Sequence, residues 1–502
     1  WKRPPLTKDG CMPGCNFQLR LPIMAACHIF TKNNCCGMLF NSYLFLIFFP
    51  VVTLLFYLLP QKARWPMLLA AGVFFYCCFV PAYLFVLIAL ILIDYFAALF
   101  IERSNQKKKW LVCSLVANIG LLVFFKYYNF FIANINYAGN FHFAILNIVL
   151  PIGLSFHTFQ AMSYTLEVYR GNVKAEKHLG IYALYILFYP QLVAGPIERP
   201  QHLLPQLHSK IKFDAQNLLN GLRLMVWGFF KKLVIADKVA LYVAIVFNHP
   251  NEYNAANVMI GIFLFSLQVY CDFSGYTDIA RGVAKTMGYD LMINFNRPFF
   301  SAGIREFWRR WHISLSSWFR DYVFKPIGGS KGGKIKTVMA FFIVFGLSGF
   351  WHGAGFNFII WGLLHALFVS LSFLLFKKEK KSWRFTGIIA TNILVAYAFV
   401  YFRESSVSNA ANVILSSIDF SNGLPFTPGI SSVHGETGIG STSMAVLLFL
   451  IGFMFFYEYK TDASLIKMNR FFVLDTAWFV FVTLSIIFFG VFTQQTFIYF
   501  QF

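Results

Sequence analysis

Long apolar segments recur along most of this sequence and are separated by short clusters of lysine and arginine. A helix needs about 20 consecutive apolar residues to cross the hydrocarbon core of a bilayer. Segments of that kind lie near residues 40–59, 65–81, 83–101, 110–125, 143–163, 180–195, 218–247, 256–271, 337–351, 357–376, 385–402, 443–457 and 472–494. We therefore expect an all-α, multipass membrane protein with about 11–13 transmembrane or re-entrant helices.

The composition excludes most soluble proteins. Of the 502 residues, 58% are hydrophobic and 13% are charged, whereas a soluble domain is roughly 45–50% apolar and about 25% charged. Aromatic residues make up 20% of the chain, more than one globular core could bury, so many of them must face lipid or lie between membrane helices. A soluble multidomain enzyme is thereby excluded.

The net charge is strongly positive, because the chain has 42 lysines and arginines against 21 aspartates and glutamates. The basic residues form short clusters between apolar segments, at Lys107–Lys109, Arg305–Arg310 and Lys377–Lys381. Cytoplasmic loops of membrane proteins have this pattern. We interpret the charge as a determinant of topology and of contact with anionic lipid, and we expect no nucleic-acid partner.

The positive-inside rule places Lys107–Lys109 and Lys377–Lys381 on the same, cytoplasmic, side. Seven candidate segments lie between them, and an odd number of full crossings would put the two clusters on opposite sides. At least one central segment is therefore expected to be re-entrant, or two to be parts of one broken span. Residues 404–441 are rich in Ser, Asn and Gly and are expected to form an extramembrane loop.

The first 37 residues differ from the rest. Met38 immediately precedes the first apolar segment, so residues 1–37 are expected to be an upstream or non-native extension and residues 38–502 a single polytopic domain. The alternative is a genuine N-terminal module with a metal knuckle made of His28 and the cysteines Cys11, Cys15, Cys27, Cys35 and Cys36. Their spacing matches no standard zinc pattern, so no metal site is predicted.

The segment from Asn296 to Gly329 has a helical pattern. Its apolar residues follow one another at intervals of three or four and share one face: Phe307, Trp311, Leu315, Trp318 and Tyr322. The other face carries Arg305, Arg309, Ser316 and Arg320, and the glycines Gly328 and Gly329 end the helix. Such basic amphipathic helices usually lie at the membrane interface. That interpretation does not account for His312, whose imidazole could be a core group, a hydrogen-bond partner or a proton carrier.

A second histidine, His352, lies between two apolar segments and is followed by Gly353, Ala354 and Gly355. An ionisable group at membrane depth is a functional candidate by default, and small residues allow another backbone or a substrate to approach closely. A neutral imidazole there could take a proton from an alcohol that attacks an activated acyl group. A hydrogen bond between helices is the alternative. We expect His365, deep in an apolar segment, to be structural.

Two aspartates, Asp272 and Asp278, lie near the end of another apolar segment. They could suggest a metal site or a proton relay. Six residues correspond to about 600° of rotation around a helix, so the two carboxylates would point in different directions. Pairing of one aspartate with Arg281 is the simpler interpretation. The sequence has no nucleophile elbow, P-loop or dinucleotide fingerprint, which argues against a serine hydrolase or an ATP-driven pump.

With these motifs the chain resembles the membrane-bound O-acyltransferase (MBOAT) family, in particular the bacterial branch that includes the alginate O-acetyltransferase membrane subunit and the D-alanyl transferase of teichoic acids. The resemblance extends from Met38 to the C-terminus. The segments that carry it are Pro151–Gln160, Tyr169–Gly171, Ala194–Arg199, Tyr270–Asp278, Phe295–Phe299, Phe307–Tyr322 and Trp351–Ala354. One departure is Phe356, where many relatives have Trp, and it affects only the expected shape of the tunnel.

The resemblance implies an MBOAT-like ring of helices around a central tunnel in the cell inner membrane. His352 falls on the family's invariant catalytic histidine and His312 on the second histidine of this branch. The implied reaction passes an acyl group, expected to be acetyl, from a cytosolic thioester to an extracytoplasmic partner protein that O-acetylates a polysaccharide such as alginate or another exopolysaccharide. Acetyl-CoA is the expected donor, and no permanently bound cofactor is implied.

On this reading His352 acts as general base on the acceptor hydroxyl or relays its proton, and His312 orients or polarises the donor carbonyl. Arg305, Arg309 and Arg310 are expected to attract the phosphates of CoA, because guanidinium groups pair with phosphate bidentately. Three alternatives stay open. They are transfer of D-alanine or another acyl group within the same family, a proton-coupled transporter or flippase, and a lipid-facing scaffold.

Overall fold

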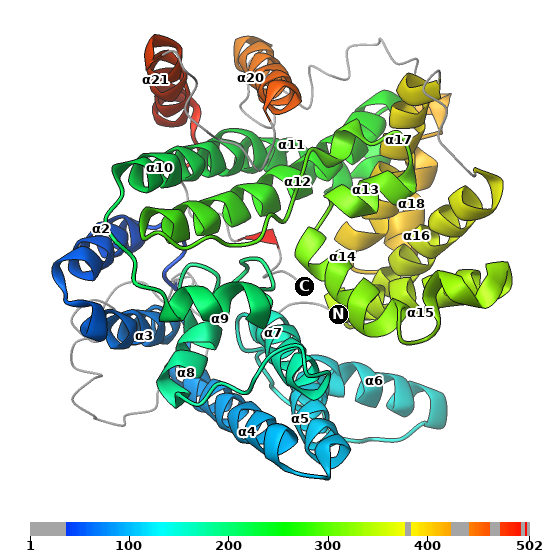
Figure 1. The fold of residues 1–502 in the computed structure, drawn as a ribbon. Helices are drawn as coiled ribbons and strands as arrows, with labels where there is room; N and C mark the ends of the chain where they lie inside the picture. Colours follow the sequence, from blue (N-terminus) through cyan, green and yellow to red (C-terminus); the bar gives the residue numbers. More distant parts are fainter. Residues whose placement is uncertain (1–36, 377–382, 423–440, 462–471, 493–496, 499–502) are drawn as a thin grey trace.

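The computed structural model describes residues 37–376, 383–422, 441–461, 472–492 and 497–498. Within these residues the regular structure is entirely helical (Figure 1). The first part of the chain forms α2 (Tyr43–Leu58), α3 (Gln61–Cys77), α4 (Leu84–Arg103), α5 (Lys107–Leu122), α6 (Tyr128–Gly139), α7 (Leu154–Tyr169), α8 (Leu179–Leu187) and α9 (Pro200–His208). A π-helical turn, η2 (Val123–Tyr127), joins α5 to α6.

The middle of the chain forms one long interrupted helix and one long continuous helix. The first consists of α10 (Ala215–Phe229), the π-helical turn η3 (Phe230–Ala236) and α11 (Asp237–Asn248), and the second is α12 (Ala255–Thr286). Glycine allows α10 and α12 to touch through their backbones. A Cβ added at Gly228 would lie 2.5 Å from the carbonyl oxygen of Gly275, so a larger residue would force the helices apart.

The last part of the chain begins with two very short helices. These are α13 (Ile304–Arg310) and α14 (Ile313–Phe319), and α14 continues into the π-helical turn η6 (Arg320–Phe324). They are followed by α15 (Gly333–His352), α16 (Phe356–Leu375), α17 (Arg384–Arg403), α18 (Val407–Ser416), α20 (Ser441–Lys460) and α21 (Phe472–Phe489).

The helices are arranged in a ring, with α10 and α12 on one side and α4, α5 and α7 on the other (Figure 1). Two residues near the C-terminus, Phe497 and Ile498, pack inside the ring against α12. The ring of Phe497 stacks on that of Tyr276 with 4.7 Å between centroids, and the backbone N–H of Ile498 donates to Asp272 Oδ2 at 2.7 Å. The tunnel that the family resemblance implies stays a prediction.

Six helical segments of the described residues are long and apolar enough to cross a membrane. They are Pro81–Arg103, Lys107–Gly139, Ala255–Thr286, Gly329–His352, Phe356–Leu375 and Arg384–Arg403. Each of them contains or overlaps a segment predicted from the sequence. Several of these helices follow one another in the chain, as in a multipass membrane protein.

Two of the predicted crossings are wrong. The segment near 143–163 is irregular as far as Gly153, and only its second half is helical. The segment near 180–195 contains only the nine residues of α8, too short to span a bilayer, followed by irregular buried backbone. Its residues are apolar because they are packed inside the protein. Irregular backbone is tolerated at membrane depth when it is buried in this way. The prediction of an irregular centre between the two basic clusters is confirmed.

The prediction of a loop over 404–441 is wrong in its first part, because residues 407–416 form α18. Ser406 caps this helix by accepting a hydrogen bond from the N–H of Asn409 at 3.1 Å, and Ala410 and Val413 bury one face of it. Residues 423–440 lie outside the described residues. So do residues 1–36 with their cysteines and His28, whereas Met38 is buried in the core, and the division at residue 38 stays a prediction.

Candidate active site

The helix predicted from the spacing of Phe307–Tyr322 is broken at His312. Its φ of 44° puts this residue in the left-handed region, and α13 and α14 run in different directions from it. A neighbouring segment supplies hydrogen bonds at the break, since Asn296 N–H donates to Arg310 O at 2.9 Å and Ile313 N–H donates to Asn294 O at 2.8 Å. The prediction of one continuous helix is therefore wrong. The break depends on contacts with another segment of the chain, and the periodicity of the helix sequence carries no information about such contacts.

The assignment of faces survives the break. Four of the five residues predicted on the apolar face are buried, namely Phe307, Trp311, Leu315 and Trp318. Arg309 and Arg320, predicted on the opposite face, are exposed. Each short helix keeps its own apolar side, and the break changes only the direction in which the second helix leaves.

One arm of the broken helix, formed by α14 and η6, runs alongside α7 in the same direction. Three contacts between the arm and α7 follow one another, from the break outward: His312 with Phe156 (ring centroids 6.4 Å apart), Trp318 with Phe159 (3.9 Å) and Tyr322 Oη with Glu167 Oε1 (2.8 Å). The arm therefore leads from His312 to the C-terminal end of α7.

The other arm, α13, lies against α16 in the opposite direction. Arg305 donates to Ser372 Oγ at 3.1 Å and to Phe376 O at 2.7 Å, near the C-terminal end of α16. Trp308 donates from its indole N–H to His365 Nδ1 at 3.4 Å, further back along α16. His312 thus lies at the apex of a wedge made by two helices that are each too short to cross a bilayer.

His352 is the last residue of α15 and lies close to the apex. It is buried, and its ring packs against those of Trp361 and Phe402 at centroid distances of 4.9 and 5.3 Å. The adjacent Trp351 connects the two histidines, because its ring centroid lies 4.9 Å from that of His352 and 6.5 Å from that of His312. The structure therefore brings together both histidines that the sequence predicted.

The hydrogen bonds of His352 determine which ring nitrogen is basic. Nδ1 lies 2.6 Å from the backbone carbonyl of Ser348, which can only accept, so Nδ1 carries the proton. Nε2 of the neutral ring therefore holds the lone pair.

The same argument applies to His312. Its Nδ1 lies 3.1 Å from Asn294 Oδ1, and that oxygen also accepts from the backbone N–H of Ser314 at 3.2 Å. The Ser314 N–H identifies the Asn294 atom as the oxygen, so His312 Nδ1 is a donor and Nε2 of the neutral ring is basic. A lone pair on Nε2 is what an imidazole needs in order to take a proton from a hydroxyl group.

Lys126, on η2, is a site residue that the sequence reasoning missed. Its ammonium donates to the carbonyl oxygens of Trp351 and His352, both at 2.7 Å, and lies 5.8 Å from the Trp351 ring centroid. Within the described residues no carboxylate pairs with it. The available signal was an isolated lysine at the end of an apolar segment, which is a functional candidate by default.

The three arginines predicted to bind CoA phosphates have different surroundings. Arg305 holds the end of α16, as described above, and Arg310 pairs with Glu306 at 2.5 Å. Arg309 is exposed. Their role toward a phosphate stays a prediction.

The two aspartates lie in a buried charge cluster, and pairing of one with arginine is confirmed. Asp278 contacts Arg281 at 3.3 Å and Lys231 at 2.5 Å. Asp272 contacts Lys232 at 2.7 Å. Neither lysine was predicted to be a partner, although their position inside an apolar segment indicated buried charge. Among the described residues no group of three or more His, Cys, Asp and Glu side chains could hold a metal ion.

Comparison with known proteins identifies the family. Residues 176–407, which include His312 and His352, match the family described as MBOAT, membrane-bound O-acyltransferase. The chain is 30% identical to the peptidoglycan O-acetyltransferase of Helicobacter pylori, over 93% of this chain and 98% of that protein.

Two further relatives have other names. The chain is 34% identical to the probable alginate O-acetylase AlgI of Pseudomonas syringae, over 76% of each protein. It is 33% identical to the teichoic acid D-alanyltransferase of Bacillus subtilis, over 51% of this chain and 68% of that protein. The chain therefore belongs to the membrane-bound O-acyltransferase family and is an acyltransferase.

Proposed function

We propose that this acyltransferase takes an acetyl group from acetyl-CoA at the cytoplasmic face of the inner membrane and passes it outward for O-acetylation of a polysaccharide, with an extracytoplasmic partner protein completing the transfer. The observation that carries the proposal is the pair of buried histidines with basic Nε2 atoms on either side of Trp351. Relatives named for O-acetylation of peptidoglycan and alginate support the class of acceptor.

In this reaction His352 Nε2 takes the proton of the acceptor hydroxyl as its oxygen attacks the thioester carbonyl. The new C–O bond replaces the C–S bond, and the leaving thiolate takes up the proton held by the imidazolium. Lys126 is a positioning residue here, because its contacts with the carbonyl groups of Trp351 and His352 hold the end of α15. General base catalysis of this kind typically contributes about 10²- to 10⁴-fold to the rate.

The geometry limits what His312 can do. Because its Nδ1–H is directed at Asn294, the neutral ring has no N–H left with which to polarise a donor carbonyl. Polarisation of the carbonyl requires the imidazolium form, whereas orientation of the hydroxyl or relay of its proton requires the neutral form. The two roles predict opposite responses to pH, since only polarisation is lost as pH rises through the pKa of this histidine.

The test is transfer of labelled acetyl from acetyl-CoA in membranes that contain the extracytoplasmic partner. The intact protein is compared with His352→Ala and His312→Ala at matched expression, and His365→Ala is the control for loss of a buried histidine of α16. We expect His352→Ala to lower transfer about 10²-fold or more and His365→Ala to retain most of it.

Three outcomes would contradict parts of the proposal. Unchanged transfer by His352→Ala would exclude the assigned role of this histidine. Labelling from a D-alanyl donor but not from acetyl-CoA would favour the D-alanyl alternative. Movement of an unmodified substrate without covalent transfer would favour the transporter.

A further inference from the structure

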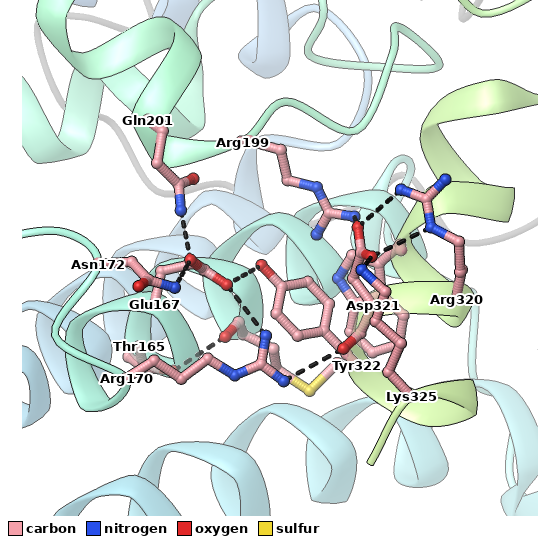
Figure 2. Close-up of polar contacts among 12 residues, drawn as sticks. Thr165, Glu167, Arg170, Asn172, Arg199, Gln201, Arg320, Asp321, Tyr322 and Lys325 are labelled. Carbon is pink, nitrogen blue, oxygen red and sulfur yellow. Dashed lines mark hydrogen bonds and ion pairs between the residues drawn. The ribbon is translucent and has the colours of Figure 1, made fainter. Parts of the chain in front are cut away.

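A second charged site lies at the far end of the arm formed by α14 and η6 (Figure 2). We call it the Arg199 cluster, and it consists of Glu167, Arg170, Arg199, Arg320, Asp321, Tyr322 and Lys325. Four of these side chains are cationic and two are carboxylates. The cluster therefore has an excess of two positive charges.

Both carboxylates are occupied by partners other than Arg199. Glu167 accepts hydrogen bonds from its neighbours Arg170 (3.2 Å), Asn172 (2.8 Å), Tyr322 (2.8 Å) and Gln201. Asp321 accepts from Arg320 at 3.1 Å and pairs with Lys325 at 2.7 Å. What remains for Arg199 is a long ion-pair contact of 3.8 Å with Asp321.

Arg199 itself is nearly buried, with 12% of its side chain exposed. Its guanidinium lies over the Tyr322 ring, 4.6 Å from the centroid, and that of Arg170 lies 4.8 Å from the same centroid. Within the described residues neither terminal nitrogen of Arg199 has a hydrogen-bond acceptor. A buried guanidinium without acceptors is costly, and an anionic ligand would supply them.

The Arg199 cluster lies at the same end of the helices as the basic cluster Lys107–Lys109. Ser114 on α5 donates to Thr165 on α7 at 3.0 Å, whereas Leu122 packs in one apolar cluster with Phe159 and Met162. Helices α5 and α7 are therefore antiparallel, and the C-terminal end of α7 lies at the N-terminal end of α5. The positive-inside rule makes that end cytoplasmic.

The distance between this cluster and the histidines is suited to an extended donor. Tyr322 follows His312 by ten residues of nearly continuous helix, which corresponds to about 15 Å. An acylated phosphopantetheine arm is a flexible chain of comparable length, with a thioester at one end and a phosphate at the other. A donor of that kind would place its phosphate and its reacting carbonyl at the two ends of the arm formed by α14 and η6.

We propose that the Arg199 cluster binds the phosphate groups of a thioester donor with a phosphopantetheine arm. The inference rests on the proposed function and deepens it by locating the donor's anionic end. Guanidinium groups are suited to this because they present parallel N–H donors to phosphate oxygens. The cluster thereby takes the role that the sequence assigned to Arg305, Arg309 and Arg310, two of which hold protein partners.

The experiment compares acetyl-CoA with S-acetyl-pantetheine, which carries the same thioester but no phosphate. With the intact protein, acetyl-CoA should have the lower KM. In Arg199→Gln the KM for acetyl-CoA should rise tenfold or more while transfer from S-acetyl-pantetheine is unchanged. Arg199→Lys should restore part of the difference. Arg103→Gln, at the exposed C-terminal end of α4, is the control for loss of an arginine with no assigned role and should leave the difference in place.

An equal loss of transfer from both donors in Arg199→Gln would overturn the assignment, because Arg199 would then support the fold and not the donor's phosphate. An Arg103→Gln effect equal to that of Arg199→Gln would also overturn it. A parallel assay with an acetylated phosphopantetheinyl carrier protein identifies the source of the phosphate. The KM should rise in Arg199→Gln for whichever of the two phosphate-bearing donors the protein uses. Binding of CoA alone to the purified protein separates the phosphate site from the proposed function. If Arg199→Gln weakens CoA binding but the intact protein transfers no acetyl group, the site is supported and the proposed function is contradicted.

Discussion

Two regions of the molecule bury positive charge in different ways. Around η3 and α12, Lys231 and Lys232 each lie within 2.7 Å of a carboxylate, and Lys232 contacts both Asp237 and Asp272 at that distance. Around the histidine wedge, by contrast, Lys126 lies on two carbonyl oxygens and Arg199 lies on an aromatic ring, neither with a carboxylate at hydrogen-bond distance among the described residues. We call the first region closed, because its cations already contact carboxylates. We call the second region open, because its two cations have no carboxylate at hydrogen-bond distance in the described part of the chain.

The difference indicates where substrate charge is expected. Cations that already contact carboxylates gain little from a further anion, and their main effect is to hold helices together. Cations without a carboxylate at hydrogen-bond distance keep most of their electrostatic attraction for charge that arrives with a donor or develops during the reaction. The closed region should therefore respond to mutation in stability, and the open region in kinetics.

The largest expected effect is in the closed region. Lys232→Met would leave Asp237 and Asp272 buried without their shared cation, at a cost of about 3–5 kcal/mol. Thermal unfolding of the detergent-solubilised protein measures the change. The matched control replaces both aspartates by Asn in the same variant, which should recover most of the stability. An unchanged melting temperature in the single variant would show that Lys232 is not needed to balance the charge of Asp237 and Asp272.

In the open region the corresponding change should alter the rate. Lys126→Met removes two hydrogen bonds from a charged donor to the end of α15, and hydrogen bonds of this type are worth about 1.5–3 kcal/mol, or roughly 10- to 100-fold in rate. We expect kcat to fall by that factor with little change in the donor KM. Lys126→Arg should recover part of kcat. A change in KM alone would show that Lys126 binds the donor instead of positioning His352.

The smallest effect is expected at a pair next to the Arg199 cluster, formed by the partly exposed His202 and the buried Glu198. His202 Nδ1 lies 2.7 Å from Glu198 Oε2, and this hydrogen bond raises the pKa of His202 above its ordinary value of 6.5. Burial raises the pKa of Glu198 as well. The folded state therefore holds both protons more tightly than the unfolded state, so their contributions to stability are lost as pH rises.

We therefore expect the melting temperature to fall slightly as pH increases from 6.5 through the raised pKa of His202. His202→Gln should flatten this dependence, and measurement of both proteins between pH 6 and 9 tests it. A dependence of equal slope in the variant would assign the effect to other groups. A rise in melting temperature with pH in the intact protein would contradict the sign of the argument.

The long apolar helices and the two histidines could be predicted from the sequence, because hydropathy and motif residues are local properties. The break at His312 could not, since it depends on Asn294 and Asn296 from a different segment. The contact of Glu167 with Tyr322 joins positions that are 155 residues apart, and no periodicity records such a pair. Buried segments such as α8 have the same composition as lipid-facing ones, which is why they were predicted to cross the membrane.

The packing of Ile498 against α12 has a consequence for biosynthesis. Its N–H is a partner of Asp272, a residue that leaves the ribosome 226 positions earlier. At roughly 5–20 residues per second, α12 waits about 11–45 s before this partner exists. During that interval Lys232 is the partner of Asp272 within the described part of the chain, so the carboxylate gains its second partner only when the last residues have been synthesised.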